Sequence, residues 1–271
     1  MRYILLFLII IIMLFPIYWM FITSISSAVY TKYPPDLFPR TVTFKTYQEL
    51  FTSPYVSTIR WAINSVIIVT IGVILSVIVS CSAGYTFSMF RFKGEKAIFW
   101  AFIATIMIAP YCLIIPMFVI TRKLGLMGWW AAILPYIFDA AAVYIFKSYA
   151  DTIPRSFVES ARMDGWGEWN IMYRIILPLC KPVIGVIILG KAMFYLQNFI
   201  WQMLVLQDKN ELTLIVGMTR NIYMKAVLSG FQPQDVNYAA AGCIMLVLPL
   251  LLFSFTSKYF VGGIIAGGVK E

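Results

Sequence analysis

The chain has 271 residues, of which 61% are hydrophobic and only 12% are charged, and its mean hydropathy is +0.85. A soluble domain normally carries about a quarter charged residues, so this composition argues against a soluble globular protein. The formal charge of +9 comes from basic residues in short loops beside apolar runs, a pattern that sets membrane orientation and does not resemble a nucleic-acid surface. Histidine is absent, which excludes a histidine metal site and a Ser-His-Asp triad.

Six apolar stretches are each about long enough to cross the ~30 Å core of a bilayer as a helix. They cover residues 4–25, 61–86, 98–120, 130–147, 183–205 and 238–260. Helices are expected because backbone polar groups in lipid must find partners within their own segment. The first stretch is longer than the apolar part of a signal peptide, so we expect a retained span. The sequence therefore predicts an all-α membrane protein, a single transmembrane domain over residues 1–271 with about six spans.

The loops between these stretches carry weaker signals. Residues 34–60 place Phe44, Tyr47, Leu50 and Phe51 at helical spacing, which fits a short amphipathic helix at the membrane surface. A plain solvated loop is an equally good interpretation there. For residues 207–237, a contact with an external partner and a solvated loop are both open.

A charged segment at 155–182, "RSFVESARMDGWGEWNIMYRIILPLCKP", interrupts the apolar pattern. Ser156 and Glu159 have the spacing of a capping box, which predicts the start of a helix that runs to about Met163. Gly165 suits a left-handed stop at the end of that helix.

A second short helix is expected from Gly167 or Glu168, before Pro178 and Pro182 redirect the chain. Apolar residues at three-to-four spacing predict one stripe along it. The stripe would consist of Trp169, Met172 or Tyr173, and Ile176. Exposed apolar positions bounded by charges favour a docking surface, and the alternative is an interfacial helix that packs only on its own bundle.

The spacing within this segment resembles the EAA loop of binding-protein-dependent ABC importer permeases. The matching residues are Glu159, Ala161, Asp164, Gly165, Ile175, Leu177, Pro178 and Pro182. Ser160 replaces the second alanine of that pattern, Trp166 replaces a small residue, and Met172 replaces the usual phenylalanine. Residues 64–96, 109–137 and the ending "YFVGGIIAGGVKE" are similar to carbohydrate-uptake permeases of the maltose-permease G type.

The resemblance implies a type I ABC importer permease fold, with a cytoplasmic loop over 148–182 that carries a coupling helix. This helix would sit in a groove of a separate ATPase, which would bind ATP-Mg; the chain itself has no G-x-x-x-x-G-K-[ST] phosphate loop and would hold no cofactor. The candidate coupling residues are Glu159, Ser160, Ala161, Arg162, Met163, Asp164, Gly165 and Trp166.

The resemblance also implies the partners and the location. We expect two ATPase subunits, a second and non-identical permease, an extracytoplasmic solute-binding protein and a sugar or oligosaccharide as the solute. The chain would be a multi-pass protein of the inner membrane with both termini in the cytoplasm. The positive-inside rule favours that orientation only slightly, and "RFKGEK" at 91–96 is its best local signal.

Polar residues within the spans suggest two further sites. Aromatic rings and amides suit sugar hydroxyls, so the fifth stretch offers candidate pathway residues, although ordinary bonding between helices is an equally good interpretation. These residues are Tyr195, Gln197, Asn198 and Trp201. Asp139 and Lys191 both lie about 12 Å deep at 1.5 Å per residue, so we expect them to pair in the bundle interior.

Two other classes of function remain as alternatives. An ion-coupled secondary transporter of a small polar solute would need a carboxylate relay inside the membrane, for which Asp139 is the candidate. An intramembrane enzyme would need a catalytic set, and no recognisable one is present in the sequence.

Overall fold

The computed structural model describes residues 2–26, 38–39, 41–52, 57–229, 236–245 and 247. The described residues fall into two compact units. One unit holds residues up to Ser65 together with those from Lys209 onward, and the other holds Val66–Asp208. The helices are α1 (Arg2–Ser24), α2 (Lys45–Thr52), α3 (Thr58–Met89), α4 (Glu95–Ala104), α5 (Pro110–Lys123), α6 (Gly128–Ile133), α7 (Ala140–Ala150), α8 (Arg155–Met163), α9 (Glu168–Ile171), α10 (Leu177–Leu179), α11 (Lys181–Gln197), α12 (Phe199–Val205) and α13 (Leu214–Ser229). The described residues also contain short 3-10 turns η1 (Thr105–Met107) and η2 (Leu134–Tyr136) and a π-helical turn (Met172–Ile176).

The first two predicted spans are continuous helices, whereas the next three are interrupted. The helices α1 and α3 are long and apolar enough to cross a membrane alone. The predicted span 98–120 instead bends by 107° between Met107 and Pro110, because the residue before a proline is pushed out of the helical region. The predicted span 130–147 bends by 46° where Asp139 begins a new helix.

The fifth and sixth predicted stretches also differ from simple helices. Within 183–205, α11 ends at Gln197 and α12 begins at Phe199, so Asn198 forms a break. The sixth stretch, 238–260, begins within a helix at Val236–Met245. Residues from 248 onward, including the C-terminal ending, lie outside the described residues.

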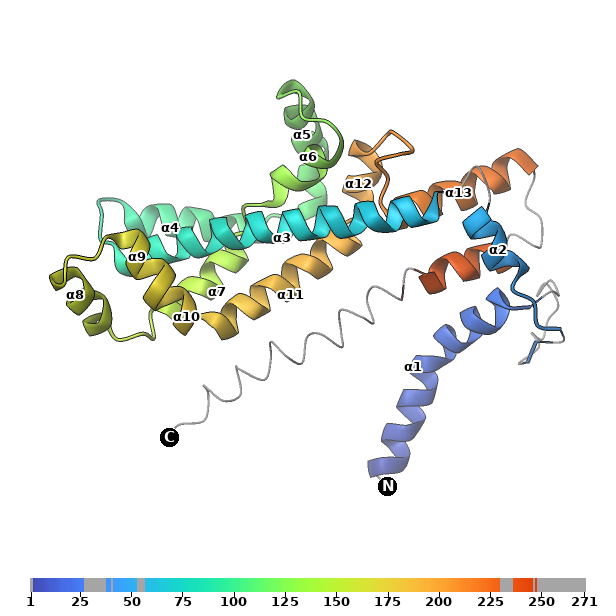
Figure 1. Cartoon of the computed structure of the whole chain (residues 1–271), viewed down its shortest axis with the longest axis horizontal. Coiled ribbons are helices and arrows are strands. Elements are labelled where there is room, and N and C mark those ends of the chain that lie inside the picture. Colours follow the sequence, from blue (N-terminus) through green and yellow to red (C-terminus); the bar gives the residue numbers. More distant parts are fainter. Residues whose placement is uncertain are drawn as a thin grey trace. The chain divides into compact units, whose positions relative to one another are not determined.

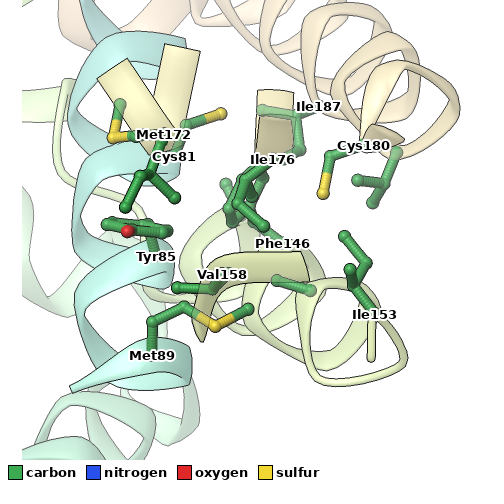
Figure 2. Close-up of a cluster of buried hydrophobic side chains, with 14 of the residues drawn as sticks. Cys81, Tyr85, Met89, Phe146, Ile153, Val158, Met172, Ile176, Cys180 and Ile187 are labelled. Carbon is green, nitrogen blue, oxygen red and sulfur yellow. The ribbon is translucent and has the colours of Figure 1, made fainter. Parts of the chain in front are cut away.

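The unit formed by Val66–Asp208 has its core at the C-terminal end of α3. Buried side chains from α3, α7, α8, the π-helical turn and α11 meet there, with Phe146 fully buried at the centre (Figure 2). Phe146 of α7 packs on this part of α3 at Gly84, and α11 lies beside α7 (Figure 1). The predicted stripe of 155–182 contributes Met172 and Ile176 to this core. The packing of Met172 and Ile176 therefore holds the charged segment against this core.

The other unit contains a helix that the sequence did not indicate. Residues Leu214–Ser229 form α13, within the region expected to be a loop. Side chains of α3 hold the residues that lead into α13. Asn64 Nδ2 donates to the carbonyls of Asn210 and Leu212. Trp61 Nε1 donates to the carbonyl of Lys209. The predicted amphipathic helix in 34–60 is confirmed as α2.

Two glycines offer a matched test of helix packing in the larger unit. A Cβ added at Gly84 in α3 would lie 2.8 Å from the ring of Phe146 and 3.1 Å from the carbonyl oxygen of Val143. A Cβ added at Gly190 in α11 would have nothing within 4 Å. The two positions thus share a residue type and a helical setting but differ in available space.

We expect Gly84→Ala to destabilise the protein by about 1–3 kcal/mol, because the extra methyl group overpacks the contact between α3 and α7. Gly190→Ala should leave stability unchanged or raise it by up to about 1 kcal/mol through helix propensity. Thermal denaturation of the purified variants in detergent measures both effects. Equal melting temperatures for the two variants would show that Gly84 does not mark a tight contact.

Candidate functional site

The helix α8 begins differently from the prediction. Pro154 occupies its N-cap, Ser156 lies in its first turn, and no side chain caps α8 among the described residues. The expected capping box between Ser156 and Glu159 is therefore wrong. Proline explains the shift, because its fixed φ favours a helix start and the first helical N–H groups need no partner within the helix. Ser160 instead donates from its hydroxyl to the carbonyl of Ser156.

The end of α8 agrees with the prediction. The helix stops at Met163, and Gly165 has a φ of 78°. The N–H of Gly165 donates to the carbonyl of Arg162 and the N–H of Trp166 donates to that of Ala161. This pair of bonds is a Schellman motif, which satisfies two helix-end carbonyls and needs a left-handed residue at the corner.

The two faces of α8 have different surroundings. Val158 and Ala161 are buried in the apolar core of the larger unit. Phe157 and Met163 are exposed, and Met163 has 88% of its surface accessible. Glu159 is exposed on the same helix and forms no salt bridge among the described residues. An apolar inner face and a mixed outer face with a long methionine are the features of a surface that a second protein can cover.

The predicted apolar stripe of the second helix divides between two faces. Glu168–Ile171 is α-helical, as expected, and the π-helical turn follows it. Met172 and Ile176 are buried in the core, whereas Trp169 and Tyr173 are exposed and stack on one another with ring centroids 6.1 Å apart. The single stripe is therefore wrong, because residues 169 and 173 share one row and residues 172 and 176 share the next.

A polar link closes the corner between the two short helices and ties it to α3. Arg162 Nε lies 2.8 Å from Glu168 Oε1, and the hydroxyl of Tyr85 donates to Glu168 Oε2 at 2.7 Å. Hydrogen bonds from Arg162 hold the pKa of Glu168 below its usual 4.5, and the bond from Tyr85 adds to this effect. A lowered carboxyl pKa means that the link stabilises the corner above pH 4.5 and is lost as the pH falls through the lowered pKa.

A second polar link holds the other end of the segment to α3. The hydroxyl of Ser88 donates to Asp151 Oδ1 at 2.7 Å, and Lys147 Nζ lies 2.6 Å from Asp151 Oδ2. Arg155 Nη2 donates to the carbonyl of Ser88 at 3.5 Å. Tyr85 and Ser88 are one turn apart on α3. The segment 151–168 is therefore fastened at its beginning and its end to the last turns of one long helix.

Trp166, which departs from the family pattern, has a defined place at the corner. The guanidinium carbon of Arg174 lies 5.7 Å from the centre of its ring, a cation–π distance. Trp166 is exposed beside the corner and is not part of the core.

The four candidate pathway residues have different surroundings. Tyr195 is buried and its hydroxyl donates to the carbonyl of Ile133, while Trp201 is buried and its Nε1 donates to the carbonyl of Ala131. Gln197 is exposed at the end of α11, and the amide nitrogen of Asn198 is buried near the hydroxyl of Tyr136.

The two ionisable residues expected to pair lie together in the structure. Lys191 Nζ is 2.9 Å from Asp139 Oδ2, and Lys191 is buried. The sequence predicted this pair but not the other groups that the two side chains bind. The described residues contain no group of three or more acidic, cysteine or histidine side chains that could hold a metal.

The family of the chain follows from its sequence. Residues 72–264 match the model of the binding-protein-dependent transport system inner membrane component. The chain belongs to this family. It is therefore a permease subunit, the non-catalytic membrane component of an ABC importer that works with separate ATPase subunits. This membership favours ATP-driven import over the ion-coupled carrier and over an intramembrane enzyme.

Curated relatives cover nearly the whole permease. The arabinooligosaccharides transport system permease protein AraQ of Bacillus subtilis is 31% identical over 264 residues, which cover 95% of this chain and 90% of the relative. The galactooligosaccharides transport system permease protein GanQ of the same organism is 32% identical, with 87% and 83% covered. The sn-glycerol-3-phosphate transport system permease protein UgpE of Rhizobium meliloti is 27% identical, with 94% and 92% covered.

Solved structures show the same fold. A chain of a bacterial ABC transporter involved in the import of the acidic polysaccharide alginate matches with a TM-score of 0.81 at 24% identity, covering 96% of this chain and 95% of that chain. A chain of the MetNI methionine ABC transporter in an inward-facing conformation matches with a TM-score of 0.54 at 17% identity, covering 76% and 95%. The permease has the type I ABC importer fold that its resemblance to the family implied.

The link at the corner predicts a change in protease sensitivity. Trypsin can cleave after Arg162 only when the corner opens, and Glu168→Gln removes the charge that holds Arg162. We expect cleavage at this site to become about two- to fivefold faster, because an exposed ion pair contributes about 0.2–1 kcal/mol. Mass spectrometry of the fragments from the detergent-purified permease measures the rate.

Glu159→Gln is the matched control, because it makes the same chemical change on the outward side of α8. Its cleavage rate should equal that of the unmodified permease. An equal increase in both variants would mean that general loss of negative charge, and not the bond to Glu168, governs the opening.

Proposed function

We propose that the permease forms half of the translocation pathway of a carbohydrate importer and couples it to an ATPase through residues 155–182. The observation that best supports this proposal is the outward face of α8, where Phe157, Glu159 and Met163 are exposed. The opposite face of α8 packs in the core of the larger unit. A protein that pushes on this face moves the core of the larger unit with it, because both ends of the segment are bonded to α3.

The residues of α8 have different roles in this proposal. Met163 and Glu159 contact the ATPase, since they face outward. Ala161 keeps the inner face small against the core, and Gly165 fixes the corner. Arg162 acts from within the permease, because its guanidinium is engaged by Glu168 and lies over the ring of Phe90. Ser160, Asp164 and Trp166 complete the exposed border of the contact.

The partners follow from the family and from the form of the site. Two ATPase subunits carry ATP-Mg, a second and non-identical permease completes the pathway, and an extracytoplasmic solute-binding protein delivers the solute. The segment 148–182 and both termini lie on the cytoplasmic side of the inner membrane in this proposal, since the ATPase needs cytoplasmic ATP. An alternating-access motion then follows from ATP-driven closure, which favours one state of the permease pair.

The proposed solute is a sugar or an oligosaccharide. Support comes from the names of the relatives, which include transporters of arabinooligosaccharides, galactooligosaccharides and maltodextrin. Within the chain, Gln197 and Asn198 at the break between α11 and α12 supply amides for sugar hydroxyls. Tyr195 and Trp201 shape the wall beside them, because their polar atoms already bind backbone carbonyls.

Vesicles reconstituted with the permease, its partner permease, the ATPase and the binding protein test this proposal. We expect uptake of a labelled oligosaccharide that requires ATP and continues without an ion gradient. ATP must be supplied on the side that carries residues 148–182. Uptake that follows an ion gradient without ATP would contradict the proposal.

The corner glycine provides a test of coupling. Gly165 has a φ of 78° with nothing near its Cβ position, so a substitution there is limited by backbone conformation and not by space. Gly165→Val should lower both transport and stimulated ATPase activity by about tenfold or more, since a β-branched residue strongly disfavours positive φ. Gly165→Asn should retain most activity, because asparagine tolerates the left-handed region.

Gly94→Val is the matched control for this series, because Gly94 has a φ of 85° and likewise nothing near its Cβ position. It carries a similar backbone cost at a turn outside the segment 155–182. We expect it to reduce stability without separating ATP hydrolysis from transport. Equal uncoupling in Gly94→Val and Gly165→Val would remove the special role of the corner.

A further inference from the structure

The break in the fourth predicted span leaves backbone groups without helical partners. The helical stretch Gly128–Tyr136 ends before residues 137–139, and α7 begins at Ala140 after a bend of 46°. Carbonyls at the end of the first piece and N–H groups at the start of the second have no helical partners. Water does not reach such groups in a lipid environment, so side chains must satisfy them.

Side chains of α11 and α12 serve the carbonyl end of this break. Lys191 Nζ donates to the carbonyl of Tyr136 at 2.9 Å. Tyr195 and Trp201 donate to carbonyls of the same helical stretch, at Ile133 and Ala131. Three donors from one neighbouring segment therefore bind the last turns of Gly128–Tyr136.

Asp139 serves the opposite end. Its Oδ1 accepts from the N–H groups of Ala141 at 2.9 Å and Ala142 at 3.3 Å, and its Oδ2 is 2.9 Å from Lys191 Nζ. The carboxylate is thus the N-cap of α7, and the ammonium group that neutralises it also binds the end of the preceding helical stretch. An anion at a helix start and a cation at a helix end both match the direction of the helix dipole.

We infer that Asp139 and Lys191 form a directional brace across the break, in which the anion belongs at the start of α7 and the cation at the end of Gly128–Tyr136. Mutual attraction is only part of its role, because each charge also satisfies backbone groups that the other could not. The brace positions the neighbouring break at Asn198, since Lys191 lies over the ring of Phe194, 5.1 Å from its centre, and Phe194 contacts Tyr136. Asp139 and Lys191 are positioning residues in this scheme.

Two double variants separate a directional brace from a simple ion pair. Asp139→Asn with Lys191→Gln is uncharged but keeps an oxygen for the N–H groups of α7 and a donor for Tyr136. Asp139→Lys with Lys191→Asp keeps opposite charges but places a donor where acceptors are needed, and an acceptor where a donor is needed. Transport in the reconstituted importer and the melting temperature of the purified importer are measured for both.

We expect the neutral variant to transport within about threefold of the unmodified permease, because asparagine caps helices about as well as aspartate. The exchanged variant should lose about tenfold or more, because buried polar groups are left without partners. The single variant Asp139→Asn should also lose about tenfold or more, since the charge of Lys191 is then buried unpaired. The neutral variant should melt at a higher temperature than the exchanged one.

The brace would be overturned if the exchanged variant of Asp139 and Lys191 had a transport rate or a melting temperature equal to or higher than that of the neutral variant. If no variant transports, or if the importer does not accept oligosaccharides, the melting temperatures of the neutral and exchanged variants still test the brace.

Discussion

The hydrogen bonds that Tyr85 and Ser88 make near the end of α3 are the constraint on which the position of residues 151–168 depends. Tyr85 binds Glu168 after the corner, and Ser88 binds Asp151 before α8. Apolar packing on one side of α8 also holds residues 151–168 against the core of the larger unit. Because apolar packing is not directional, it keeps the segment close but does not fix its angle, whereas the two polar links define both ends.

A similar demand governs the breaks inside the helical spans. The chain bends where a backbone group can be satisfied by something other than the next turn of helix. Asp139 and Lys191 supply those partners at one bend, and the Schellman bonds around Gly165 supply them at the corner. At the break of Asn198, Gln202 Nε2 donates to the carbonyl of Tyr195 at 2.6 Å.

Features set by local chemistry could be predicted from the sequence. Gly165 marked the corner because only a residue that tolerates positive φ ends a helix in this way, and the pairing of Asp139 with Lys191 followed from their depth in apolar stretches. The helix α13 could not be found, because the partners that hold its beginning, Trp61 and Asn64, lie almost 150 residues earlier. The bend before Pro110 was missed for another reason: composition alone does not distinguish a straight span from a broken one.

The outward face of α8 and the brace at Asp139 belong to one mechanical path in the larger unit. Phe146 of α7 packs in the core that holds Val158 of α8, and α7 begins at the carboxylate of Asp139. A displacement of α8 is therefore carried by close-packed side chains to α7 and then reaches the bend. Close packing transmits such a displacement with little loss, since the interior has few voids in which side chains can yield. Asp139 at this bend pairs with Lys191 on α11, two turns before the break at Asn198, so α8 and that break are connected through named contacts.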